Sequence, residues 1–173
     1  MIDEKRVKDI LTALDNNSLR VNRLVNGIIG EYVEDLDKYL EDIRDKVENG
    51  ELSDNELEKI TIRLPTYIYF ANERLENLGV EGDVAESIKN EAFDEEILKV
   101  EGTIPEKKSQ ANLATIEEDL MEKAYKRAYK KLKSKIEKAE NIYTGVKKIV
   151  DKRKAEMTLN YSTSTVGQNG DKD

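Results

Sequence analysis

Apolar residues recur at helical spacing along almost the whole chain, and this periodicity restricts the fold to helices. It is clearest from residue 125 onward, where apolar positions alternate steps of four and three over about four and a half heptads, as in a coiled coil. Apolar and charged residues each make up 38% of the chain, which favours helices with one narrow buried stripe. This heptad seam consists of Tyr125, Tyr129, Leu132, Ile136, Ala139, Tyr143, Val146, Val150, Arg153 and Met157.

The pattern predicts an all-α helical bundle with a long basic C-terminal coiled-coil-like helix. A first helix is expected before Asp15. A second helix carries an apolar face from Leu24 to Val47 and ends at Asn49-Gly50, because glycine readily adopts the left-handed conformation that closes a helix.

A third helix is expected to start at the capping box Ser53–Glu56, in which the serine oxygen accepts a hydrogen bond from an unpaired amide. Pro65 falls inside its apolar stripe and predicts a kink or a restart, and Gly79 predicts its end. A second capping pattern at Asp83 predicts a shorter helix toward Val100. Two short apolar segments are the candidates for strands: Ile62–Leu64 and Ile97–Val100.

Glu101–Pro105 contains a glycine and a proline between two helical patterns, which indicates a turn or hinge. This boundary divides the chain into an acidic N-terminal helical region (1–100), a hinge (101–105) and a long basic amphipathic helix (106–157). The last residues, 158–173, are small and polar and are expected to be a disordered tail.

Positive charge is concentrated in one part of an acidic chain. Residues 122–154 hold thirteen Lys or Arg against four Asp or Glu, a net charge of +9, whereas the whole chain carries −8. Such a separation points to an anionic partner or to self-assembly through complementary surfaces. The cations could neutralise phosphates, with Tyr125 and Tyr129 stacking on unpaired bases. Alternatively, the lysines form an ordinary solvated face or dock on the chain's own acidic helices, and the tyrosines belong to the core.

The seam also allows two interpretations. It could pack within one chain as in an ordinary bundle, or it could pair between copies, since the chain has little other apolar surface to cover. The second interpretation predicts a homo-oligomer with these oligomerisation residues: Leu132, Ile136, Tyr143, Val146 and Val150.

Several kinds of chemistry are excluded because the chain has no Cys and no His. Disulfides, thiolate nucleophiles, histidine bases and Cys/His zinc sites are all impossible. The carboxylate pairs Glu31–Glu34 and Glu91–Asp94 resemble those of all-α nucleotide pyrophosphohydrolases, but solvated helix faces explain them better. We therefore expect a protein that is not an enzyme and uses no cofactor or metal. No apolar run approaches the ~20 residues of a membrane span, so we expect no membrane partner and a cytoplasmic location, the host cytoplasm if the chain is phage-encoded.

The last third of the chain resembles the phage recombination mediators of the UvsY type. The resemblance rests on Val-Lys-x-Ile-x-Asp-x-Arg-x-x-Glu over Val146–Glu156 and on the short apolar segment Ile97–Val100, and it spans Ile97–Met157. It implies a small helical protein that binds single-stranded DNA, forms rings and helps to load a recombinase, with a recombinase or single-strand-binding protein as a further partner. Charge then selects these positions for phosphate contact: Lys126, Arg127, Lys130, Lys131, Lys133, Lys147, Lys148 and Arg153.

Two departures from that family weaken the DNA-binding part of the resemblance more than the assembly part. This chain is longer at its N-terminus, and an acidic region stands where family members carry basic residues before the long helix. The alternative function is a structural or adaptor protein, such as a virion component or scaffold, that uses the basic helix for protein contacts. Salt separates the two functions, since phosphate binding weakens steeply with salt and apolar docking does not.

Overall fold

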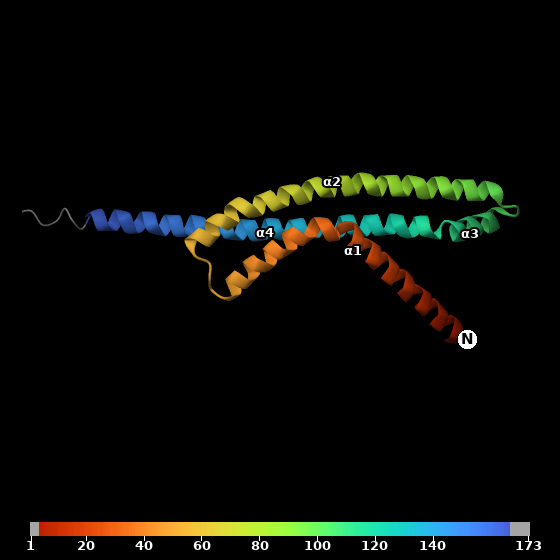
Figure 1. Ribbon diagram of the computed structural model, residues 1–173, viewed down its shortest axis with the longest axis horizontal. Coiled ribbons are helices and arrows are strands. Elements are labelled where there is room, and N and C mark those ends of the chain that lie inside the picture. The colour runs from red at the N-terminus through yellow and green to blue at the C-terminus, as the bar shows by residue number, and fades with distance from the viewer. Residues whose placement is uncertain (1–3, 167–173) are drawn as a thin grey trace, which may run out of the picture. The chain divides into compact units, whose positions relative to one another are not determined.

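The computed structural model describes the backbone of residues 4–166 and the side chains of residues 16–30 and 33–159. Its four helices are α1 (Glu4–Glu48), α2 (Asp54–Lys99), α3 (Ile104–Ala114) and α4 (Ile116–Val166), labelled in Figure 1. Residues 4–166 contain no strand, so the predicted all-α fold is confirmed. No helix in this part of the chain combines the length and apolar character that membrane crossing requires.

Helix α2 is longer and more continuous than the sequence suggested. Both strand candidates belong to it, apart from the terminal Val100, and it neither restarts at Pro65 nor ends at Gly79. Proline removes one amide hydrogen bond, but the buried stripe runs through this point without a break, so packing on both sides holds the helix together. The stripe consists of Leu57, Ile60, Leu64 and Ile68. The two helices expected before Val47 are likewise one helix, α1.

Helix α1 ends where the sequence predicted. Gly50 has a φ of 72°, and the amides of Gly50 and Glu51 donate to the carbonyls of Val47 (3.2 Å) and Lys46 (2.9 Å). These are the two hydrogen bonds of a Schellman cap. At the start of α2, the Glu56 amide donates to Ser53 Oγ (3.3 Å), which is half of the expected capping box. The Glu56 carboxylate binds Lys46 and Lys59 instead of the Ser53 amide.

The basic helix expected over 106–157 is in fact two helices. A capping box opens α3, because Glu106 Oε2 accepts hydrogen bonds from the Thr103 amide (2.9 Å) and hydroxyl (2.8 Å). The chain then breaks at Thr115, whose amide (3.0 Å) and hydroxyl (2.9 Å) both donate to the Ala111 carbonyl. Helix α4 continues to Val166, so residues 158–166 of the expected disordered tail are helical, and residues 167–173 lie outside the described part.

The chain forms two compact units, and the division between them does not fall at residues 101–105, the boundary expected from the sequence. The first unit contains Met1–Glu34 and Ala71–Ser134, and the second contains Asp35–Phe70 and Lys135–Asp173. Each unit therefore combines a segment of α1, one of α2 and one of α4. Acidic and basic parts of the sequence are packed together within each unit and do not form separate domains.

The heptad seam supplies core residues to both units. Leu132 in the first unit and Ile136, Ala139 and Val146 in the second are all at most 5% exposed. These side chains are already covered within one chain, so Leu132, Ile136 and Val146 leave little apolar surface for contact with a second copy. Tyr143 and Val150 are only half-buried.

Candidate nucleic-acid interface

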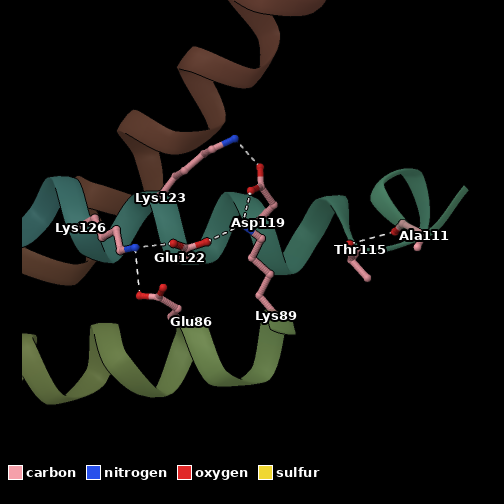
Figure 2. A network of polar contacts seen from close by, with 8 residues as sticks. All are labelled: Glu86, Lys89, Ala111, Thr115, Asp119, Glu122, Lys123 and Lys126. Atoms are coloured by element: carbon pink, nitrogen blue, oxygen red, sulfur yellow. Dashed lines mark hydrogen bonds and ion pairs between the residues drawn. The ribbon is translucent and has the colours of Figure 1, made fainter. Parts of the chain in front are cut away.

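Helices α2 and α4 are joined in the first unit by a network of ion pairs, drawn in Figure 2. Lys89 Nζ lies 2.7 Å from Glu122 Oε2 and 2.9 Å from Asp119 Oδ1. Lys126 Nζ lies 2.5 Å from Glu122 Oε1 and 3.0 Å from Glu86 Oε2. Asp119 also pairs with Lys123. The Glu122 side chain, at 10% exposure, therefore bridges one lysine from each helix.

These contacts shift the ionisation of the groups in the network. The hydrogen bonds from Lys126 and then Lys89 lower the pKa of Glu122, and those to Glu122 and then Glu86 raise the pKa of Lys126. Burial opposes ionisation of Asp119, but the hydrogen bonds from Lys123 and Lys89 outweigh it and lower the pKa of that carboxyl. The network thus holds its members charged and clamps α4 to α2.

Three of the eight residues predicted to contact phosphate already have partners inside the chain. Lys126 belongs to the network, and Lys131 donates to Asn26 Oδ1 (3.0 Å). Arg153 lies 2.5 Å from Asp54 Oδ1 and donates to the Leu52 carbonyl (3.1 Å). Except for Glu122, which precedes Lys126 by four residues, the partners of these cations are far away along the chain, so the sequence alone did not show the pairing.

The other five predicted cations are exposed and form no hydrogen bond or ion pair within the described part of the chain. They divide between the units: Arg127, Lys130 and Lys133 in the first, Lys147 and Lys148 in the second. The first three follow one another at intervals of three residues and so lie along one side of α4. We call Arg127, Lys130 and Lys133 the open cation row.

A shallow hollow of about 340 Å³ lies beside this row, between α2 and α4 of the first unit. Tyr125 and Tyr129 line it with half-buried rings, and Lys130 of the open cation row is at its edge. Gly79 lies against one ring, and a Cβ added there would make an ordinary van der Waals contact of 3.7 Å with Tyr129 Cε2. The remaining lining residues are Leu78, Gly79, Gly82, Asp83 and Lys126.

Only one of the two carboxylate pairs considered for metal-dependent hydrolysis has both of its side chains described. Glu91 and Asp94 are both exposed on α2, and the side chain of Glu31 lies outside the described residues. Among the residues that are described, no group of three or more carboxylates is placed to hold a metal ion.

An apolar hollow of the first unit was not predicted from the sequence. Its signal was present as Val80, Val84 and Ile88, which follow one another at intervals of four residues on α2.

Comparison of the chain with known proteins finds no matching family model, no matching curated protein and no matching solved structure.

Proposed function

We propose that this chain is a non-enzymatic protein that binds single-stranded nucleic acid through the open cation row on α4. The observation that carries the proposal is the set of three adjacent cations without a carboxylate partner in a chain with 37 acidic and 29 basic residues. An acidic chain offers many partners for a cation, so a row that stays unpaired and exposed is available for an external anion.

The Tyr125 and Tyr129 rings are the reason to expect that the protein prefers unpaired bases. Stacking on an aromatic side chain contributes about 1–3 kcal/mol per base and tolerates any sequence, because every base has a π-face. In duplex nucleic acid the base faces are already stacked on one another. The combination of half-buried rings with Lys130 of the open cation row in the lining of the same hollow therefore favours a single strand.

The role proposed for this binding is that of a recombination mediator of the UvsY type, in agreement with the sequence resemblance over Ile97–Met157. A mediator of this kind gains avidity when several copies present the same modest phosphate patch to one strand. In this chain such assembly would have to use surfaces other than Leu132, Ile136 and Val146, which are buried in the core.

The test is fluorescence anisotropy with a labelled single-stranded oligonucleotide at several salt concentrations. Three phosphate contacts predict a slope of about −2 in log affinity against log salt, or a roughly twentyfold loss between 50 and 200 mM. The variant R127E/K130E/K133E should abolish binding. The control R23E/R63E/K108E makes the same change in net charge at exposed, unpaired positions on α1, α2 and α3, and it should lose much less affinity.

Equal losses in the two triple variants would show that only overall charge matters and would contradict the proposed site. If the oligonucleotide does not bind at low salt, the function is that of the structural or adaptor protein, with the cations of α4 reserved for protein contacts.

A further inference from the structure

The first unit has an apolar hollow of about 470 Å³ between α2 and α4. Its α2 side is the row Val80, Val84 and Ile88, whose members are 64%, 51% and 53% exposed. Met121, which is also exposed, and Tyr125 line it from α4. Large apolar side chains that are both clustered and exposed are characteristic of interaction sites.

Every charged side chain that lines this hollow is acidic: Glu81, Glu117 and Glu118. Glu117 binds Arg20 (2.7 Å) and Glu81 lies 3.7 Å from Arg74, both at positions outside the lining. Glu118 differs, because its Oε2 is buried and has no hydrogen-bond partner in the described part of the chain. A buried carboxylate oxygen is normally hydrogen-bonded, so Glu118 has one unpaired acceptor in the wall of the hollow, beneath its accessible surface.

The walls of the hollow determine which backbone conformation fits. Both are helices, whose amides and carbonyls are paired within each helix, so they offer no edge on which an extended peptide could form main-chain hydrogen bonds. A helical occupant brings its own hydrogen bonds and needs only side-chain contacts. The row from Val80 to Ile88 is about 12 Å long at 1.5 Å per residue, which matches two turns of a helix laid along the groove.

We propose that this hollow binds an amphipathic helix of another protein, with an apolar face that contacts Val80, Val84 and Ile88 and with flanking Lys or Arg side chains. One of these cations pairs with Glu118, and others face Glu81 and Glu117. Charge also argues against a second copy docking through the same hollow, because the two acidic rims would face each other. The proposal does not depend on nucleic-acid binding and is tested without any nucleic acid.

The experiment uses the full chain and two labelled peptides of about 18 residues, roughly 27 Å as helices. They share one leucine face and carry either lysines or glutamates at its flanks. In an anisotropy titration the lysine peptide should bind at least tenfold more tightly than the glutamate peptide. V84Q/I88Q should weaken binding of the lysine peptide at least tenfold, and E118Q should weaken it severalfold.

The matched control is L98Q, because Leu98 is an 85% exposed apolar residue of α2 that does not line the hollow. It should bind like the parent chain. The substituted valine and isoleucine are exposed, so circular dichroism should show an unchanged helical spectrum and separate loss of binding from loss of fold. Equal affinity for the two peptides, or an unchanged affinity in V84Q/I88Q, would overturn the proposal. It would also be overturned if light scattering showed a dimer of the parent chain that V84Q/I88Q dissociates, because the occupant would then be a second copy.

Discussion

The two units are built from segments of the same three long helices, but their cores differ in side-chain size. In the second unit, large aliphatic residues dominate the core, including the fully buried Leu36, Leu57, Ile60 and Leu64. In the first unit, α2, α3 and α4 supply Leu78, Leu120 and Leu132 to the core together with five alanines. The alanines are Ala71, Ala85, Ala111, Ala124 and Ala128.

This difference has consequences at the surface. An alanine buries much less apolar area than a leucine, so contacts through alanines stabilise the pairing of α2 and α4 less than leucine contacts would, and the ion pairs between these helices add to it. Helices that meet through alanines also leave larger side chains outside, as with Val80, Val84 and Ile88. In the first unit, a core richer in alanine thus goes together with apolar and charged side chains that stay exposed and available for partners.

The largest expected effect tests the difference between the cores. Leu64 is completely buried in the second unit, so Leu64→Ala should lower the free energy of unfolding by about 2–5 kcal/mol through lost burial and a cavity. Ala124 is completely buried in the first unit, and Ala124→Gly should cost only about 1–2 kcal/mol through helix propensity and one methyl group. Urea unfolding followed by circular dichroism measures both losses.

Equal losses of unfolding free energy in Leu64→Ala and Ala124→Gly would contradict the proposed difference between the two cores. Ile62→Ala provides the control for Leu64→Ala, because Ile62 is 65% exposed on the same helix. The free energy of unfolding of the Ile62→Ala variant should stay within about 0.5 kcal/mol of the parent value.

A second prediction concerns acid and the ion-pair network of the first unit. Glu122 has a folded pKa below its ordinary value of 4.5, so its stabilising effect is fully present above that value and is lost as pH falls through the folded pKa. Glu122→Gln removes a carboxylate that accepts two charged hydrogen bonds and should cost about 1–3 kcal/mol at pH 7. Below pH 4.5 the difference between this variant and the parent chain should shrink.

The measurement is the urea midpoint of both proteins from neutral pH to about pH 2. The second unit provides an internal comparison, because hydrogen bonds from Lys59 and then Lys46 lower the pKa of Glu56 to about 2. Its contribution therefore persists to lower pH and is unchanged in E122Q. A difference between E122Q and the parent that stayed constant down to pH 2 would contradict the role of the Glu122 carboxylate. The exposed Glu91→Gln serves as a control with little expected effect at any pH.

The fold was largely predictable because its signals are periodic. The stripe through Leu57, Ile60 and Leu64 marks a buried helix face without reference to any other part of the chain. The continuity of α2 was not predictable, since Gly79 and Pro65 are local stop signals and tertiary packing overrides them. Gly79 instead lies inside the helix, in contact range of the Tyr129 ring.

The candidate site was predictable only in part. That the open cation row avoids the core follows from its place between seam positions, as the seam residues take the inner side of α4. The pairing of Lys126 with Glu86 and of Lys131 with Asn26 depends on which helices become neighbours, and a charge count carries no such information. The apolar hollow was not predictable from the sequence for a related reason. Val80, Val84 and Ile88 have the spacing of core residues, but more than half of each lies exposed in the structure.

The smallest expected effect comes from the helix backbone of the second unit, at a site where side-chain packing contributes nothing. Gly145 lies within α4 in the second unit, and a Cβ added there would have no neighbour within 4 Å. Gly145→Ala should therefore stabilise the chain by about 0.5–1 kcal/mol, because alanine has less backbone freedom to lose on folding. The opposite sign is expected for Gly50→Ala, since the φ of 72° at the end of α1 is unfavourable for alanine by about 1–2 kcal/mol. Urea unfolding of both variants measures the two signs. If Gly145→Ala instead destabilised the chain, this glycine would have to serve a contact or a bend of α4 in solution.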